Sequence, residues 1–318
     1  MKRVAVLTSG GDSPGMNAAI RAVTRTCLFK GYDVYGIRYG YRGLYDDEME
    51  FLQKKSVSEK INHGGTFLGT SRFEDLKNDE VAQKCANNLL KRDIQHLVVI
   101  GGDGSYRGAH KLGQFGIKVY CLPGTIDNDI ASSKLSIGFD TATNTVVEAI
   151  DRIKDSSSSH SRCSIVEVMG KNCGDIALHA GIAVGAEAII TNKEEFSFDK
   201  VVEIVDESYQ ARKANTIIVV TENICNVIEL AKYVEDKTTM ETRSTILGYI
   251  QRGGVPSALD RFIASSLGAF TVELIEQDIE NISVGTTGLT FYYTDLAEAL
   301  EMEADSKEKL VRLSNYLV

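Results

Sequence analysis

The feature that most constrains the fold is a set of short apolar runs without polar alternation. Residues 97–100 read LVVI and residues 216–221 read TIIVVT. A strand with one face in water alternates apolar and polar residues, whereas a parallel strand covered by helices on both faces is apolar throughout. Because parallel strands need crossover connections, usually helices, the pattern predicts an α/β fold with doubly wound, mostly parallel sheets.

Segments with helical periodicity alternate with these runs, as such a fold requires. Strands are predicted at 3–9 and 33–38, in IQHLVVIG, in IKVYCLP, at 163–170 and at 215–223. Helices are predicted from about Asn17, near 79–92, at 141–154, and from near Ser257 and Thr294. The serine-rich stretch DSSSSHS (155–161) is interpreted as a short loop, with a linker as the alternative.

Composition argues against several classes of protein. The chain has 318 residues, of which 43% are hydrophobic and 25% charged, as is ordinary for a globular protein. The net charge of −9 argues against a general nucleic-acid surface, so a bound anion needs a local basic cluster. No apolar stretch approaches the ~20 residues of a membrane span. The six cysteines lie far apart and no Cys/His group has zinc-ligand spacing, which favours free thiols in a reducing cytoplasm.

Glycine-rich segments follow apolar runs at five places: SGGDSPGMN, IGGDGS, LPGTIDND, VMGKNCGD and QRGGVPS. In open α/β sheets, ligands bind beyond the carboxyl ends of the strands, where loops carry the chemistry. We therefore expect the functional site in these loops.

The first loop, TSGGDSPGMNAAI, permits close approach of a ligand at Gly10 and Gly11, and a helix N-terminus suited to phosphate follows it. It is not a Walker A loop, because Met16 and Asn17 replace Lys and Ser/Thr. It is not G-x-G-x-x-G either, because Asp12 stands at the second glycine position. A phosphate-binding loop and a simple strand-to-helix turn both stay open.

The next two loops place carboxylates after buried strands. In VVIGGDGS, Asp103 offers oxygen ligands for Mg²⁺, while N–H groups from Gly102 to Ser105 suit nucleotide phosphates. In PGTIDND, an extended backbone would place Asp127 and Asp129 on the same side, with their Cα atoms ~6–7 Å apart. Phosphoryl transfer needs a base and charge neutralisation, so Asp127 is interpreted as the base and Asp129 as its helper. For both loops a polar turn is the alternative.

Basic residues in or beside turn-rich segments would supply counter-charge for phosphate. Arg21 and Arg25 lie one helical turn apart, away from the apolar face of the first predicted helix. Their face suits either solvent or a second anion. The other candidates are Arg72, Arg162, Lys171, Arg243 and Arg252, four of which lie in or beside turn-rich segments. For each of them alone, a solvated surface charge is the alternative.

Taken in order, LTSGGDSPGMNAAIR, GGTFLGTSR, VVIGGDGSYRGA, LPGTIDNDI, IVEVMGKNCGD and LGYIQRGG resemble ATP-dependent 6-phosphofructokinases of the bacterial type, up to about residue 270. The resemblance implies transfer of the ATP γ-phosphoryl group to the 1-hydroxyl of fructose 6-phosphate, with Mg²⁺, in a cytoplasmic homotetramer with shared active sites. It implies two Rossmann-like domains: an ATP-binding domain at 1–138 plus about 251–300, and a fructose 6-phosphate-binding domain at 139–250 plus about 301–318.

The resemblance also implies a role for each matching residue. Asp127 would accept the proton beside Thr125, and Asp103 would hold Mg²⁺. Gly104 and Gly124 favour ATP over pyrophosphate, because pyrophosphate-using relatives carry Asp and Lys there. The implied catalytic set is Asp127, Thr125, Lys171, Arg72 and Asp129. ATP would contact Gly11, Arg72, Phe73, Gly102, Asp103, Gly104 and Ser105. The sugar phosphate would contact Thr125, Asp127, Arg162, Met169, Gly170, Lys171, Glu222, Arg243, Tyr249 and Arg252, with Arg162 and Arg243 supplied by a neighbouring subunit.

Some positions depart from the family pattern. Lys171 stands where the family usually has arginine, so the charge is kept but the bidentate fork is lost. Tyr249 stands in place of a histidine. The implied effector site for ADP or phosphoenolpyruvate is more altered, with Lys54 and Lys154 in place of arginines and Ala211 and Ala214 in place of basic residues. We therefore expect altered or weak allosteric control through the remaining set, which is Arg21, Arg25, Lys154, Gly185, Glu187 and Lys213.

Two rival interpretations remain. A different kinase with a GGDG loop, acting on NAD or a lipid, would explain residues 101–104 but not PGTIDND or the arginines. A catalytically impaired regulatory subunit is suggested only by Lys171 and Tyr249. The retained Asp103, Thr125 and Asp127 weigh against it.

Overall fold

The computed structural model describes residues 1–171, 173–194 and 196–317, which form two compact units. The first unit contains residues 1–141 and 252–304, and the second contains residues 142–251 together with the chain from Asp305 onward. Among the described residues, no helix has both the length and the apolar character needed to cross a membrane.

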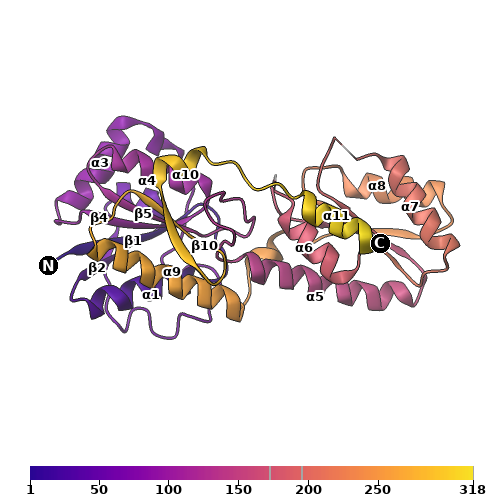
Figure 1. The fold of residues 1–318 in the computed structure, drawn as a ribbon, viewed down its shortest axis with the longest axis horizontal. Helices are drawn as coiled ribbons and strands as arrows, with labels where there is room; N and C mark the ends of the chain where they lie inside the picture. Colours follow the sequence, from indigo (N-terminus) through magenta and orange to yellow (C-terminus); the bar gives the residue numbers. More distant parts are fainter. Residues whose placement is uncertain (172, 195, 318) are drawn as a thin grey trace. The chain divides into compact units, whose positions relative to one another are not determined.

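The first unit is built on a seven-stranded sheet in the order β11-β10-β5-β4-β1-β2-β3 (Figure 1). Its central strands are parallel, and the β2–β3 and β10–β11 pairs are antiparallel. The strands are β1 (Arg3–Ser9), β2 (Asp33–Ile37), β3 (Met49–Phe51), β4 (His96–Gly101), β5 (Lys118–Pro123), β10 (Ile282–Thr286) and β11 (Phe291–Asp295).

Helices cover both faces of this sheet, which is why residues 4–7 of β1 are apolar without alternation. Val4 and Val6 pack into a core with α1 (Met16–Phe29) and α9 (Ala258–Glu276). Leu7 points the other way, into the core formed by the remaining helices. These are α2 (Gly40–Tyr45), α3 (Asp79–Leu90), α4 (Asp103–Gly113) and α10 (Leu296–Glu301), with the short 3₁₀ segment η1 (Glu74–Lys77).

The second unit contains a parallel four-stranded sheet in the order β7-β8-β6-β9. Its strands are β6 (Cys163–Val168), β7 (Ala188–Ile190), β8 (Thr216–Thr221) and β9 (Thr242–Ile246). Apolar residues of α7 (Phe198–Gln210) and α8 (Val227–Lys237) pack with β6 and β8 in one core. The unit also contains most of α5 (Phe139–Ser158) and η2 (Gly248–Arg252), together with α6 (Asp175–Val184) and α11 (Glu308–Leu317).

The predicted α/β class with mostly parallel sheets is confirmed, and several local predictions need correction. Residues 155–158 continue α5, so the predicted serine-rich loop is wrong at its beginning. Thr294 lies in β11, and the helix predicted there begins at Leu296 after an Asp295 cap. The edge strands β3 and β11 were not predicted. They are short antiparallel additions whose pairing depends on neighbours distant in the sequence.

Candidate active site

One group of candidate residues lies where the strand order reverses in the first unit. β1 has β2 on one side and β4 on the other, and the chain continues from β4 to β5 away from β1. Ser9 pairs with Gly101, and Gly101 pairs with Pro123, so the loops after β1, β4 and β5 begin side by side. Such a reversal at the carboxyl edge is where open α/β sheets bind ligands.

The loop after β4 is held tightly to its neighbours. The Ser105 hydroxyl donates to the Ser9 carbonyl at 3.0 Å, and the Tyr41 hydroxyl donates to the Ser105 carbonyl at 2.6 Å. A Cβ on Gly101 would lie 2.5 Å from Ser105 Oγ, so only glycine fits there. Gly104, by contrast, is exposed and has no atom within 4 Å of its Cβ position. The structure therefore leaves open space at Gly104, whereas the Ser105 side chain holds the loop in place.

Asp103 is the first residue of α4, and the N-cap residue Gly102 makes no side-chain hydrogen bond to the helix. Its carboxylate pairs with Arg107 at 3.0 Å and is 42% exposed. No group of three or more His, Cys, Asp or Glu side chains suited to a metal occurs among the described residues. Mg²⁺ at nucleotide sites commonly takes one or two carboxylates together with phosphate oxygens and water, so a single accessible carboxylate fits that ion.

The loop after β1 is paired with the segment that contains GGTFLGTSR. The Thr70 hydroxyl donates to the Gly10 carbonyl at 3.0 Å, and the Asn17 side chain accepts from Phe67 N–H at 2.8 Å. Arg72 follows this segment with an exposed side chain. The ring of its neighbour Phe73 packs at 5.6 Å from that of Tyr45.

Arg252 also comes close to the loop after β1. A Cβ on Gly11 would lie 3.4 Å from the Arg252 guanidinium carbon. Within the first unit, the structure thus brings Arg252, a residue predicted to bind the sugar phosphate, beside Gly11, a residue predicted to bind the nucleotide.

The loop after β5 is bent rather than extended, so the extended backbone assumed in placing Asp127 and Asp129 on the same side is wrong. Residues 126 and 127 form a bend, and Asn128 has a left-handed φ of 54°. Thr125 Oγ1 accepts from Asp127 N–H at 3.2 Å. A Cβ on Gly102 would lie 3.7 Å from that of Thr125, which places the base loop beside the GGDG loop. One carboxylate oxygen of each aspartate is buried.

Asn128 holds this bend and was missed from the sequence. Its amide oxygen accepts from Ser136 N–H at 2.9 Å, and its amide nitrogen donates to the Lys134 carbonyl at 3.2 Å. Asparagine tolerates the left-handed region better than most residues. An Asn between two aspartates was therefore the available signal for a turn that sets their directions.

The second unit presents a loop after β6 that is fixed from its neighbours. Met169 N–H donates to Gln251 Oε1 at 3.0 Å, and Lys171 N–H donates to Glu222 Oε1 at 2.9 Å. Gly170 N–H donates to the same Glu222 oxygen at 3.3 Å. Met169, Gly170, Lys171 and Glu222 are thus brought together as predicted, and Lys171 is exposed.

Carboxylate charge also gathers at this end of the β6 strand. Burial, together with the charge of Glu222, raises the pKa of Glu167, which lies at the end of β6. Tyr249 in the nearby η2 segment is 78% exposed. Gln251, fully buried, was missed because its backbone-binding role depends on the fold rather than on a charge pattern.

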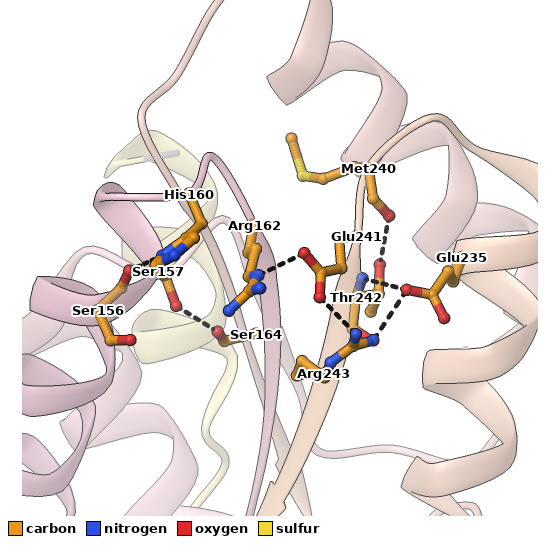
Figure 2. Close-up of polar contacts among 10 residues, drawn as sticks. All are labelled: Ser156, Ser157, His160, Arg162, Ser164, Glu235, Met240, Glu241, Thr242 and Arg243. Carbon is orange, nitrogen blue, oxygen red and sulfur yellow. Dashed lines mark hydrogen bonds and ion pairs between the residues drawn. The ribbon is translucent and has the colours of Figure 1, made fainter.

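Arg162 and Arg243 lie at the opposite edge of the same sheet. Arg162 precedes β6, whereas Met169 follows it, and six strand residues span roughly 20 Å. Figure 2 shows both arginines around Glu241: Arg162 Nε lies 2.5 Å from Glu241 Oε2, and Arg243 contacts the other Glu241 oxygen. Arg243 also pairs with Glu235 at 2.8 Å. The hydrogen bond from Arg162 lowers the pKa of the Glu241 carboxyl.

The structure divides the predicted effector residues between the two units. Arg21 and Arg25 lie on α1, partly exposed. In the second unit, Lys213 pairs with Glu187 at 3.5 Å, and Glu187 also accepts from Ile217 N–H at 2.6 Å. Lys154 donates to the Val184 carbonyl, next to Gly185 at the end of α6.

Comparison with known proteins identifies relatives over almost the whole chain. Residues 3–275 match the family model described as Phosphofructokinase. The chain is 50% identical over 301 residues to the ATP-dependent 6-phosphofructokinase of Pectobacterium carotovorum, covering 95% of this chain and 94% of that one. It is 50% identical over 315 residues to ATP-dependent 6-phosphofructokinase 1 of Clostridium perfringens, covering 99% of each.

Solved structures show the same fold. The phosphofructokinase of Saccharomyces cerevisiae aligns with a TM-score of 0.89 and 30% identity, over 100% of this chain and 47% of the longer yeast chain. The pyrophosphate-dependent phosphofructokinase of Marinobacter aquaeolei aligns with a TM-score of 0.84 at 22% identity, over 96% of this chain and 86% of that one.

Proposed function

Because the chain belongs to the phosphofructokinase family, we propose that it transfers the γ-phosphoryl group of ATP to the 1-hydroxyl of D-fructose 6-phosphate, giving fructose 1,6-bisphosphate and ADP. The observation that carries the proposal is the convergence of the GGDG loop and the Thr125–Asp127 loop at the strand-order reversal. That edge combines phosphate-binding backbone with a carboxylate positioned by its own turn.

We assign the nucleotide to the first unit, held by the loop after β1, by Arg72 and Phe73, and by the GGDG loop. Asp103 would hold Mg²⁺, which neutralises phosphate charge when bound. Asp127 takes the proton of the sugar 1-hydroxyl. At the same time the hydroxyl oxygen bonds to the γ-phosphorus of ATP, and the bond from that phosphorus to the bridging oxygen breaks and releases ADP. Thr125 and Asp129 orient this group. The exposed Gly104 leaves room for an ATP phosphate chain.

We assign the sugar phosphate to the loop after β6, where Lys171 supplies charge to the transferred phosphoryl group. Met169, Gly170, Glu222 and Tyr249 are assigned to the sugar, and so is Arg252, which belongs to the first unit. Arg162 and Arg243 lie at the opposite edge of the same sheet, so they suit the sugar phosphate of a neighbouring subunit. We therefore propose a homotetramer with shared active sites.

The effector residues support only weak control. Lys213 forms an ion pair with Glu187, and Lys154 donates a hydrogen bond to a backbone carbonyl. Part of the basic charge is therefore already paired within the chain. Since Ala211 and Ala214 add none, we expect phosphoenolpyruvate or ADP to shift the affinity for the sugar little. The cytoplasm is the proposed compartment, because all six cysteines are free thiols.

The decisive experiment is a coupled assay with purified protein, Mg²⁺ and fructose 6-phosphate, run in parallel with ATP and with pyrophosphate. We expect ADP formation with ATP and no turnover with pyrophosphate. No ADP above background would overturn the kinase assignment, and turnover with pyrophosphate alone would overturn the choice of donor. Adding phosphoenolpyruvate to the same assay tests the effector proposal, which a large change in sugar KM would contradict.

A further inference from the structure

A lysine near the end of the chain contacts the loop that presents Lys171. Lys307, just before α11, donates to the Cys173 carbonyl at 2.7 Å and to Cys173 Sγ at 2.7 Å. It also pairs with Asp175 at 2.5 Å, and the two side chains are 25% and 10% exposed. All three residues belong to the second unit. Lys307 lies beyond residue 275, where the family match ends.

The contacted loop has an unusual backbone that needs support. Gly170, Lys171 and Gly174 have φ values of 140°, 53° and 73°. A non-glycine residue in the left-handed region is strained and persists where its surroundings hold it. Lys171 therefore depends on the contacts on either side of it.

Those contacts come from three directions. On the strand side, Gln251 and Glu222 accept the backbone N–H groups of Met169 and Lys171. Cys173 N–H donates to the Gly170 carbonyl at 2.8 Å and closes the turn. On the helix side, Lys307 reaches the loop from a segment far along the chain and binds Cys173 directly.

We propose that Lys307 is a positioning residue for phosphoryl transfer. It fixes the helix side of the Gly170–Cys173 turn, while Glu222 fixes the strand side, and together they hold the backbone from which Lys171 acts. The proposal rests on the proposed function, because it assigns Lys307 an effect through Lys171. It also gives the C-terminal segment a part in catalysis.

The first test measures steady-state kinetics of Lys307→Met, which keeps the side-chain length but removes all three donors. We expect kcat to fall roughly tenfold, with KM for ATP changed less than about twofold, since a small misplacement of a charged group costs turnover steeply. Lys307→Arg, which keeps charge and donors, should recover most of kcat. The matched control Lys309→Met removes an exposed lysine two residues away and should match wild type. Unchanged kcat in Lys307→Met overturns the proposal.

The second test separates positioning from general damage by a double-mutant cycle with Lys171→Met. If Lys307 acts through Lys171, its removal should have little further effect once Lys171 is gone. A second tenfold loss in that background would mean a general structural role and would overturn the proposal. Wild-type inactivity would instead overturn the proposed function, so the two failures are distinguishable.

A third measurement reports on the contact itself, without activity. Burial raises the pKa of the Cys173 thiol, and the Lys307 ammonium 2.7 Å from its Sγ lowers it. Removing Lys307 should therefore leave less thiolate and slow the alkylation of Cys173 by N-ethylmaleimide, measured by peptide mass spectrometry. Cys225, the other partly exposed cysteine, serves as the internal reference and should react at an unchanged rate. Equal rates at Cys173 in wild type and Lys307→Met would show that the contact does not shape the loop, against the proposal.

Discussion

The two units present their candidate binding residues in different ways. In the first unit, neighbouring parallel strands end in glycine-rich loops, and the backbone itself forms the surface. In the second, side chains such as Glu222 and Gln251 bind the backbone of a single loop, while Arg162 and Arg243 lie at the far edge of the sheet. The first arrangement uses the backbone of neighbouring loops, whereas the second uses side chains at two opposite edges of one sheet.

The difference follows from the ligand that the loops of each unit are proposed to recognise. Phosphates of a nucleotide are well served by helix N-termini and close backbone approach, which glycines at strand ends supply locally. A sugar phosphate needs placed charges, and guanidinium groups on a rigid edge can serve a neighbouring subunit only if something keeps them oriented. Glu241, which contacts both arginines, does this within the chain.

The largest expected effect comes from removing the proposed base in the first unit. Asp127→Ser should lower kcat by roughly 10²–10⁴-fold, the usual contribution of a positioned general base, because no group would then accept the hydroxyl proton. Nucleotide affinity, measured by titration with an ATP analogue, should stay within about twofold of wild type. Unchanged turnover would contradict the role of Asp127, and lost nucleotide binding would indicate a damaged loop instead.

Subunit mixing tests whether the second unit needs a partner. Asp127→Ser and Arg243→Ser subunits should each be nearly inactive as homo-oligomers. Hybrids formed by refolding an equal mixture should regain roughly a quarter of wild-type activity, because across a symmetric interface half of the contacts are mixed and half of their sites carry neither change. A mixture as inactive as its components would mean that Arg243 serves its own chain, and mixing Asp127→Ser with itself is the control.

Two glycines test whether the loop after β4 depends on close packing of its backbone. Gly101→Ala should destabilise the protein by about 1–3 kcal/mol, because its Cβ would lie 2.6 Å from the Ser9 carbonyl oxygen. Gly104→Ala, three residues on, meets no atom within 4 Å and should change stability by less than ~0.5 kcal/mol. Urea unfolding of both variants measures the difference. Equal stabilities would show that the loop can relax around a side chain.

The sequence was most informative where chemistry is local. Apolar runs without alternation predicted β4 and β8, and the glycine-rich segments after β1, β4 and β5 predicted which loops meet at the edge of the first sheet. These signals need only a strand period and the backbone freedom of glycine. The same reasoning failed for the backbone of residues 127–129, because it assumed an extended segment where Asn128 has a left-handed φ.

Residues whose roles come from long-range contacts were not predictable from their own neighbourhoods. Gln251 binds Met169, and Asp260, completely buried, accepts from Gly138 and Thr141 N–H groups, both at 2.8 Å. Nothing in a single sequence marks a polar residue whose partner lies 82 or 119 positions away. The far-edge position of Arg162 and Arg243 likewise depends on strand direction, which only the folded sheet fixes.

The smallest expected effect is a pH dependence of stability specific to the first unit. His96 opens β4, with Nδ1 3.0 Å from the Tyr120 hydroxyl, and burial lowers its pKa from 6.5 to about 4. Between these pH values the unfolded chain binds a proton that the folded chain does not, so the free energy of unfolding falls as pH drops from 6.5 towards 4. Above pH 6.5 both states are neutral and the contribution is complete.

Replacing His96 with Gln, which keeps a polar partner near Tyr120, should remove that part of the pH dependence. Urea midpoints at pH 7.5 and pH 5 would then differ less for His96→Gln than for wild type. His110, on α4 and partly exposed, offers a matched control whose replacement by Gln should leave the wild-type difference in place. If His96→Gln and wild type lose stability in parallel on acidification, His96 does not contribute, and the acid sensitivity must come from carboxylates in either unit.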